Sequence, residues 1–384
     1  MIHELRIHAL RNLSQASLSV TQCNVIVGKN GSGKTSLLEA VFLLSRGKSF
    51  RHHEPKRYIQ HHAKSCAVWA CIDHQKTIAI QKQLDSAGLA STLLKVNQTT
   101  VHSQSALSFL LPTLLIDPTG MSVLEEGSAS RRQLLDWLAF HVETRFYPTW
   151  LSYQRLLKQR NALLKSAHLP TAELVAWDRE LSVSAQALHE CRQAVFGRWQ
   201  GFFGAMVARL LPDYEGQLQL SYQAGFDVQA GLFETLKSRL HQDRELGYTR
   251  IGAHRADVVI TLKNTSEQGD RLKEQAVNVL SRGEKKLLIT ALKLSQLQLI
   301  CEHLHDIKPV VLIDDVDAEL DQRAVGVLLD TVLDLPCQLF ITSLQEATAK
   351  QVQDKMAQLG KDEEQFSLFH VEHGVIKKQE NSGE

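Results

Sequence analysis

The 384-residue chain is poor in several features that would each point to a particular class of protein. Its six cysteines form no C-x-x-C pair, so the sequence favours reduced, partly buried thiols and gives no indication of a zinc site. Forty-three basic residues are balanced by 42 acidic ones, so any site for a polyanion must be a local patch. No apolar run approaches the roughly 20 residues that a membrane span needs. The amino terminus also lacks the pattern of a signal peptide, and we expect a cytoplasmic protein with no membrane contact.

Apolar patterning divides the chain into an α/β part, an all-helical part and a second α/β part. The first part predicts alternating strands, a buried parallel strand at 23–27, a helix at 35–45, antiparallel strands at 66–82 and 92–101, and a buried strand at 113–116. From about Val123 to Arg209 the pattern predicts three amphipathic helices, separated by breaks at Pro148 and at 168–170. The third part predicts strands at 217–222, 248–251, 257–263, 309–313 and 338–342, helices from Ser281 and near 321–334, and a disordered polar tail.

The simplest architecture for this order is an α/β head domain that is split by an inserted helical arm. We expect an amino-terminal lobe at 1–120, the helical arm at 121–249, a carboxy-terminal lobe at 250–372 and a tail at 373–384.

Residues 28–35, GKNGSGKT, match the phosphate-binding pattern G-x-x-x-x-G-K-[ST]. The expected strand before the loop and the expected helix after it argue against a glycine-rich turn that binds no ligand. In such a loop the backbone N–H groups and the helix amino terminus face a phosphate. Lys34 can reach the β- and γ-phosphates, and the Thr35 hydroxyl can ligate Mg²⁺. The predicted nucleotide site comprises Gly28, Lys29, Asn30, Gly31, Ser32, Gly33, Lys34, Thr35 and Ser36.

A second acidic motif follows the apolar run at 310–313. Four successive apolar residues predict a strand buried on both faces, and ligands sit at the carboxyl ends of such parallel strands. Asp314 is then placed to hold Mg²⁺, and Asp315 to orient or deprotonate an attacking water. The alternative is a surface turn that is merely rich in aspartate.

The stretch LSRGEKKLL at 280–288 has the residues of a helix capping box, with Ser281 as the N-cap and Glu284 three residues later. It also lies about 30 residues before the acidic strand, where ABC-type ATPases carry a Leu-Ser-Gly-Gly-like signature. In that fold the signature completes the site of a second copy, so Ser281 would face the γ-phosphate that the partner holds. The alternative is a helix cap and nothing more.

Several longer stretches extend the likeness to one family. They are LRNL (10–13), GKNGSGKTSLLEAVFLL (28–44), RGKSFR (46–51), RRQLLDW (131–137), RLLKQRNALL (155–164), GAHRAD (252–257), LSRGEKKLL (280–288) and LIDDVDAELD (312–321). Generic ATPase heads lack RLLKQRNALL and GAHRAD. The chain resembles the RecF family of bacterial recombination-repair ATPases, which are related to the heads of SMC-type proteins and have an ABC-type ATPase fold.

This resemblance implies a cytoplasmic protein that binds ATP, Mg²⁺ and DNA, dimerises on ATP and hydrolyses it slowly, with DNA stimulating. It implies work with RecO and RecR to load RecA at single-stranded gaps, with effects on replication restart and the SOS response. The catalytic residues would be Lys34, Asp314, Asp315 and Ser281, with Mg²⁺ held by Thr35 and Asp314. Arg11 and Asn12 would lie beside the nucleotide.

The chain also departs from the usual ABC pattern at several positions. Asp315 stands where many relatives have glutamate, and Arg282 replaces the second glycine of the signature. No glutamine follows the strand at 113–116, and Ser343 stands where a γ-phosphate histidine is common.

On a helical wheel of residues 155–165, Arg155, Lys158 and Lys165 lie opposite an arc of leucines. They form either an ordinary solvated face or a stripe that contacts DNA phosphates. Arg160 falls within the apolar arc, where it could pair across a dimer or extend its charged end to solvent. A second basic patch lies at 46–57. No base-reading module is present, so little sequence preference is expected.

Two other functions use the same phosphate loop: a metabolic phosphotransferase and the cytosolic ATPase of a membrane transporter. The Ser281 helix disfavours the first, because a kinase needs no second subunit to complete its site. The helical insertion and the missing glutamine and histidine disfavour the second.

Overall fold

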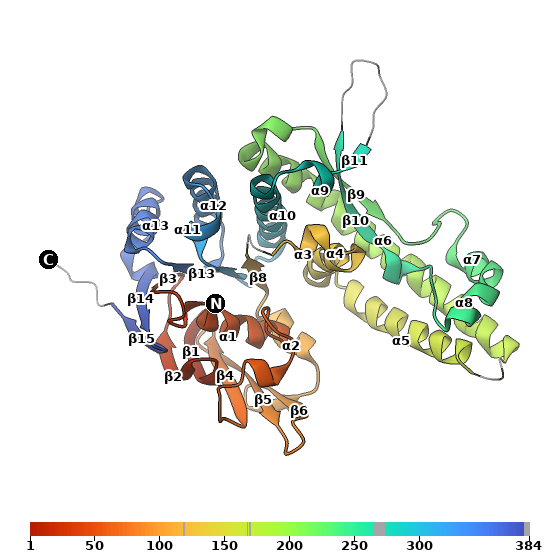
Figure 1. The fold of residues 1–384 in the computed structure, drawn as a ribbon, viewed down its shortest axis with the longest axis horizontal. Coiled ribbons are helices and arrows are strands. Elements are labelled where there is room, and N and C mark those ends of the chain that lie inside the picture. Colours follow the sequence, from red (N-terminus) through yellow and green to blue (C-terminus); the bar gives the residue numbers. More distant parts are fainter. Residues whose placement is uncertain (118–119, 167, 169, 264–272, 380–384) are drawn as a thin grey trace. The chain divides into compact units, whose positions relative to one another are not determined.

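The computed structural model describes residues 1–117, 120–166, 168, 170–263 and 273–379. The chain forms two compact units (Figure 1). The first unit is built from Met1–Thr119 and Cys301–Glu384, and the second from Gly120–Ile300. The middle of the chain is therefore an insertion into a unit that both ends of the chain build together.

The first unit contains a mixed sheet in the order β15-β14-β3-β13-β12-β8. Neighbouring strands are parallel except for β14 and β15, which are antiparallel. Strands β3, β12 and β13 are fully buried, and burial on both faces accounts for their apolar runs at 25–27, 310–313 and 339–341. The bounds are β3 Cys23–Val27, β8 Thr113–Ile116, β12 Val310–Ile313, β13 Gln338–Ser343, β14 Phe366–Glu372 and β15 Val375–Lys378. The strands predicted at 23–27, 113–116, 309–313 and 338–342 are confirmed.

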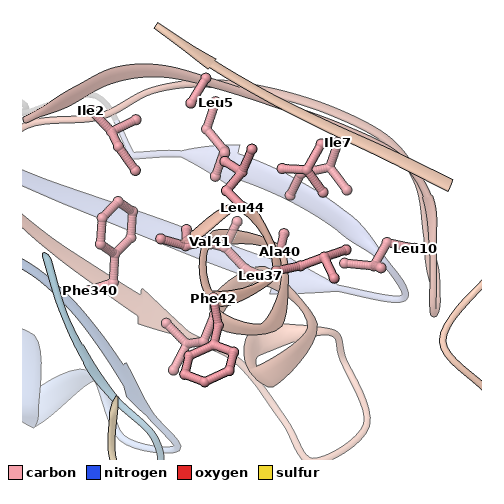
Figure 2. Packing of buried hydrophobic residues seen from close by; sticks show 14 of the residues in the cluster. Ile2, Leu5, Ile7, Leu10, Leu37, Ala40, Val41, Phe42, Leu44 and Phe340 are labelled. Atoms are coloured by element: carbon pink, nitrogen blue, oxygen red, sulfur yellow. The ribbon is translucent and has the colours of Figure 1, made fainter. Parts of the chain in front are cut away.

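An antiparallel sheet, in the order β2-β1-β4-β5-β6-β7, completes the strands of this unit. The bounds are β1 Ile2–Leu10, β2 Leu13–Ser19, β4 Ser65–Ile72, β5 Lys76–Leu84, β6 Ala90–Val96 and β7 Thr99–Val101. Helix α1 (Lys34–Arg46) is buried along nearly its whole length in the core of this unit. Figure 2 shows Leu37, Val41 and Leu44 of α1 in one cluster with Ile2 and Leu5 of β1.

The remaining helical elements of the first unit are η1 Pro55–Arg57, α2 Gln104–Leu110, α11 Val316–Glu319, α12 Gln322–Asp334, α13 Glu346–Gln358 and η4 Glu363–Gln365. Helix α12 begins with a side-chain cap, because the Asp321 carboxylate accepts a 2.7 Å hydrogen bond from the Ala324 N–H. The prediction of a polar tail at 373–384 is wrong for residues 375–378. Residues 375–378 form strand β15, because their backbone groups pair with β14. Residues 380–384 lie outside the described part of the chain.

The second unit is mainly helical. Its elements are α3 Ser122–Glu125, α4 Ser128–Val142, α5 Phe146–Leu164, α6 Thr171–Leu210, η2 Pro212–Tyr214, β9 Leu218–Gln223, α7 Leu232–Ser238, α8 Leu240–Leu246, η3 Ala253–Arg255, β10 Asp257–Lys263, β11 Lys273–Gln275, α9 Ala276–Val279 and α10 Arg282–His303, which crosses the unit boundary. Helices α5 and α6 lie side by side (Figure 1). Within the described ranges, no helix is both long and apolar enough to cross a bilayer.

Two expectations for this unit are wrong. Pro148 does not separate helices but lies in the first turn of α5, where a proline removes no intrahelical hydrogen bond. Residues 248–251 form a loop rather than a strand, because the polar groups of Thr249 bond to helix α5 and to His254. Helix α5 ends at Leu164 and α6 begins at Thr171, on either side of the predicted break at 168–170, in which residue 169 lies outside the described residues.

The second unit also extends beyond the arm that the sequence places at 121–249. Strand β10 pairs with β9, and the Arg131 guanidinium of α4 binds the Asp257 carboxylate at 2.8 Å. These contacts join β10 to β9 and α4 of the second unit, whereas the sequence-based division assigns β10 to the carboxy-terminal lobe.

Candidate functional site

The phosphate-binding pattern forms a loop between β3 and α1, and two of its glycines need a left-handed backbone. Gly31 has φ 76° and Gly33 has φ 122°, conformations that other residues rarely adopt. Asn12 holds the loop from outside, because its amide nitrogen donates to the carbonyls of Gly31 and Ser32 at 3.2 and 2.9 Å. Gly28 is required for a different reason, since a Cβ there would lie 2.4 Å from the Val371 carbonyl oxygen.

Lys34 lies inside the loop, with its side chain only 4% exposed. Its ammonium donates to the carbonyls of Gly28 and Lys29 at 2.8 and 3.3 Å, and it lies 3.7 Å from Asp315 Oδ1. The loop thus places one cation at its centre, next to the end of the acidic strand.

A cavity of about 550 Å³ opens over this loop. It is lined by Arg11, Asn12, Lys29, Asn30, Gly31, Ser32, Gly33, Lys34, Thr35, Ser36, Arg51 and Asp315. Most of the predicted nucleotide residues therefore share one concave surface. Arg51 is an addition, because the sequence placed it in the basic patch at 46–57 and not beside the nucleotide. Arg51 is the last residue of the RGKSFR stretch at 46–51, and this stretch was the sequence feature that could have indicated it.

A buried carboxylate positions the two arginines of this cavity. The guanidinium of Arg11 binds Glu39 through two hydrogen bonds of 2.9 Å, and Glu39 is fully buried. Glu39 also accepts a hydrogen bond from the Ser49 hydroxyl, whose oxygen in turn accepts the Arg51 backbone N–H at 3.0 Å. Glu39, which belongs to helix α1, therefore binds the Arg11 side chain directly and holds the Arg51 backbone through Ser49.

The first acidic residue, Asp314, lies at the end of β12 and reaches the start of α1. Thr35 Oγ1 donates to Asp314 Oδ1 at 3.1 Å, and Thr342 Oγ1 donates to the same oxygen at 2.8 Å. Burial raises the pKa of Asp314, and the negative charges of Asp315 and Asp117 raise it further against these two hydrogen bonds. A carboxylate in these surroundings favours a nearby cation.

The residues around Asp314 fit a magnesium ion. Mg²⁺ prefers oxygen ligands, and the Thr35 hydroxyl and Asp314 carboxylate supply them at the edge of the phosphate loop. The Oδ1 atom of Asp315 is buried and has no hydrogen-bond partner within the described ranges, which leaves an anionic oxygen facing the same region.

Thr342, near the end of β13, connects the two acidic residues. No sequence pattern indicated it as a residue of the site. Its hydroxyl donates to Asp314 and accepts the Asp315 backbone N–H at 2.7 Å, while Asp315 adopts a left-handed φ of 42°. Ser343, which stands in place of a γ-phosphate histidine, is buried and donates to Asp317 Oδ2 at 2.8 Å. Ser343 therefore stabilises the turn after the acidic strand.

Ser281 lies in the second unit, where it caps helix α10 as the capping-box pattern predicts. The Ser281 N–H donates to Glu284 Oε2 at 2.7 Å, and the Glu284 N–H donates to Ser281 Oγ at 3.4 Å. Hydrogen bonds from Ser281 and from the Tyr214 hydroxyl lower the pKa of Glu284. The cap leaves Ser281 itself exposed at the start of the helix.

The basic residues of α5 divide into two groups. Arg155, Lys158 and Lys165 are exposed, as the helical wheel predicts. Arg160 is fully buried, and its guanidinium binds Asp178 at 2.6 Å and Asp243 at 2.8 Å. Neither suggestion for Arg160 is therefore correct, because its partners lie within its own unit and its charge is compensated there.

Comparison with known proteins agrees with this architecture. The family described as the RecF/RecN/SMC N terminal domain matches residues 1–367. The DNA replication and repair protein RecF of Acinetobacter baylyi is 42% identical over 98% of this chain and 99% of its own length. RecF of Cellvibrio japonicus is 36% identical over 97% of this chain and 98% of its own.

Solved structures show the same fold. A structure of the recombination mediator RecF with ATP aligns with a TM-score of 0.79 at 23% identity, covering 99% of this chain and 97% of that one. An Smc head domain from Pyrococcus furiosus aligns with a TM-score of 0.52 at 15% identity, covering 98% and 95%. The fold is thus an ABC-type ATPase head of the SMC and RecF kind, with an inserted helical arm. With relatives this similar over nearly its whole length, the chain belongs to the RecF family of DNA replication and repair proteins.

Proposed function

We propose that this protein is an ATP-dependent DNA-binding protein of recombinational repair. It dimerises on ATP, recognises gapped DNA and helps RecO and RecR to load RecA in the cytoplasm, with roles in replication restart and SOS induction. Its enzymatic activity is a slow, DNA-stimulated hydrolysis of ATP to ADP and phosphate, which acts as a conformational switch. The first unit, which carries the phosphate loop and the acidic strand, holds ATP, and the helical arm of the second unit contacts DNA.

One observation carries the ATPase part of the proposal: Thr35 and Asp314, 279 residues apart, meet at 3.1 Å at the edge of a cavity formed by the phosphate loop. A hydroxyl and a carboxylate at that position suit a nucleotide held together with Mg²⁺. RecF proteins with this fold include one solved with ATP.

In this mechanism Lys34 exchanges its carbonyl partners for the β- and γ-phosphates, and the loop N–H groups bind the remaining phosphate oxygens. Thr35 and Asp314 would hold Mg²⁺, and the ion would supply positive charge beside the phosphates. Asp315 orients the attacking water and accepts its proton. Its buried Oδ1, which accepts no hydrogen bond from the described residues, suits that role.

Ser281 acts on the nucleotide of a second copy. The capping box fixes the first turn of α10, so Ser281 and the positive end of the helix dipole are presented together. ATP then joins two heads, and hydrolysis releases them. Arg155, Lys158 and Lys165 of each arm contact DNA phosphates with little sequence preference.

Sedimentation tests the proposal directly. We expect the full-length protein to be a monomer with ADP and a dimer with ATP or a non-hydrolysable analogue, and gapped DNA to favour the dimer. Lys34→Arg should lose the dimer because it disturbs the phosphate cradle of its own subunit. Ser281→Arg should lose it because a bulky cation blocks the opposite face.

Ser86→Arg is the matched control, since Ser86 is exposed in a turn of the first unit and should leave the dimer intact. A protein that remains monomeric with the analogue, yet hydrolyses ATP at a rate linear in its concentration, would overturn the proposal and favour a phosphotransferase.

A further inference from the structure

Residues 247–256, which we call the arm loop, run along α5 in the opposite direction to the helix. His254 Nδ1 lies 2.7 Å from the Tyr153 hydroxyl, and the Thr249 N–H and hydroxyl donate to Asn161 Oδ1 at 2.9 and 2.7 Å. At Gly247 an added Cβ would lie 3.4 Å from Lys165 Cγ, so the Lys165 stem passes beside the beginning of the loop. The loop is thus fixed to α5 over three turns of the helix.

A buried ionic network holds the middle of the arm loop. Arg160 Nη1 donates to the Thr249 hydroxyl at 2.7 Å and to Asp243 Oδ2 at 2.8 Å, while Nε binds Asp178. The other oxygen of Asp243 accepts the Arg250 backbone N–H at 3.2 Å. Removing a partner from a buried ion pair is costly, so these bonds hold one conformation of the loop. Arg160 Nη2 is buried and has no hydrogen-bond partner among the described residues. Arg160 belongs to the RLLKQRNALL stretch, and His254, which bonds to Tyr153 and to the Thr249 carbonyl, belongs to GAHRAD.

The fixed conformation turns Thr249 towards α5 and leaves its neighbours exposed. Thr249 is 1% exposed, whereas Tyr248 is 41% exposed and Arg250 is also exposed. The exposed Arg255 places its guanidinium 5.9 Å from the centre of the Tyr248 ring. Two cations and an aromatic ring therefore lie on the outer side of the arm loop.

The arm loop, which carries these cations, contacts α5 beside part of its basic stripe. Lys165 follows the last residue of α5 and keeps a helical backbone, so it lies on the same face as Lys158 seven residues earlier. Asn161 between them anchors Thr249. The acidic residues of this stretch do not cancel the charge, because Asp243 is bound to Arg160 and Asp257 to Arg131. Glu245 is exposed beside His241. The net surface is basic, and it fits a polyanion with regularly spaced charges.

We propose that the arm loop extends the basic stripe of α5, so that Arg250 and Arg255 bind the phosphate backbone of duplex DNA together with Lys158 and Lys165. The buried network of Arg160 positions these two arginines. This inference rests on the proposed DNA-binding function and assigns residues to it outside the helix.

The test measures binding of the full-length protein, with a non-hydrolysable ATP analogue, to a labelled duplex over a series of salt concentrations. Each neutralised phosphate contributes roughly 0.9 to the slope of log affinity against log salt. We expect Arg250→Gln and Arg255→Gln each to lower the slope by about one, and the double variant by about two. Arg198→Gln, an exposed arginine on α6, is the control and should leave the slope unchanged.

Thr249→Val tests the positioning role, because it removes the hydroxyl that joins Arg160 to Asn161 and keeps every charge. We expect faster amide exchange at 248–255 and several-fold weaker duplex binding. Unchanged binding with faster exchange would refute the positioning role.

If Arg250→Gln and Arg255→Gln behave like Arg198→Gln while the parent protein binds duplex with a steep slope, the loop inference fails and the proposed function stands. If the parent protein binds no duplex at low salt, the DNA-binding function fails, and the loop inference with it.

Discussion

Thr342 Oγ1 donates a 2.8 Å hydrogen bond to Asp314 Oδ1, and the same oxygen accepts the backbone N–H of Asp315. One hydroxyl therefore fixes both acidic residues of the candidate site. We expect Thr342→Val, which keeps the shape and removes the hydroxyl, to lower the rate of ATP hydrolysis. A hydrogen bond to a charged group contributes about 1.5–3 kcal/mol, which corresponds to a decrease of about 10- to 150-fold.

Phosphate release measures the rate of hydrolysis of this variant, and a separate binding titration measures its affinity for ATP. We expect the affinity to change little. Thr290→Val is the matched control, since the Thr290 hydroxyl donates to the Lys286 carbonyl of its own helix in the second unit. Hydrolysis by Thr342→Val at the parent rate would show that Asp314 and Asp315 need no such positioning.

Gly28→Ala should abolish nucleotide binding. The new methyl group would lie 2.4 Å from the Val371 carbonyl oxygen and 2.8 Å from Ser32 Oγ, so the backbone of β14 or of the loop must move. Calorimetric titration with ATP measures the effect. Gly201→Ala in helix α6 meets no atom within 4 Å and should bind ATP normally, with stability raised by about 0.5–1 kcal/mol. ATP binding by Gly28→Ala with parent affinity would contradict the close approach.

Arg160→Met should destabilise the protein by about 3–5 kcal/mol, because it leaves the buried carboxylates of Asp178 and Asp243 without their cation. Urea unfolding measures the change. Arg155→Met, on the exposed side of the same helix, should change stability by less than about 0.5 kcal/mol. Equal effects of the two substitutions would mean that the ionic network contributes nothing to stability.

His254 predicts a pH dependence of stability. Its Nε2 lies 3.0 Å from the Thr249 carbonyl, which can only accept, so Nε2 carries the proton and Nδ1 accepts from the Tyr153 hydroxyl. Burial lowers the pKa of His254 to about 4, with a smaller contribution from the positive charge of Arg255. In the unfolded chain the imidazole takes up a proton near its ordinary pKa of 6.5.

Between pH 6.5 and pH 4 the unfolded chain therefore binds more protons than the folded protein, and acidification favours unfolding. The contribution of His254 is fully present above pH 6.5 and decreases by up to about 1.4 kcal/mol per pH unit as the pH falls towards 4. His254→Gln cannot titrate, so its unfolding free energy should depend less on pH in this window. Parallel pH profiles for the two proteins would refute the assignment.

The α5 stripe gives a prediction for DNA binding. Replacing Arg155, Lys158 and Lys165 together by glutamine should lower the salt slope of duplex binding by about three, roughly one for each phosphate that the variant no longer neutralises. Arg198→Gln again serves as the control. An unchanged slope would leave these residues as an ordinary solvated surface.

The sequence predicted most of the α/β elements correctly, because a parallel strand buried on both faces needs an uninterrupted apolar run. Val310 to Ile313 is such a run. It failed at Pro148 and at 248–251, where local residue types suggested a break and a strand. The outcome there depended on where backbone N–H groups find acceptors, which a local pattern does not specify.

By itself the sequence determined the phosphate loop, the acidic strand end and the capping box of α10, since each is a short pattern whose geometry follows from neighbouring residues. Only the tertiary structure decided which distant groups meet. It paired Arg160 with Asp178 and Asp243, and it placed Thr342 between Asp314 and Asp315. Buried charges and hydroxyls must find partners wherever the folded chain supplies them, and those partners can lie anywhere along the sequence.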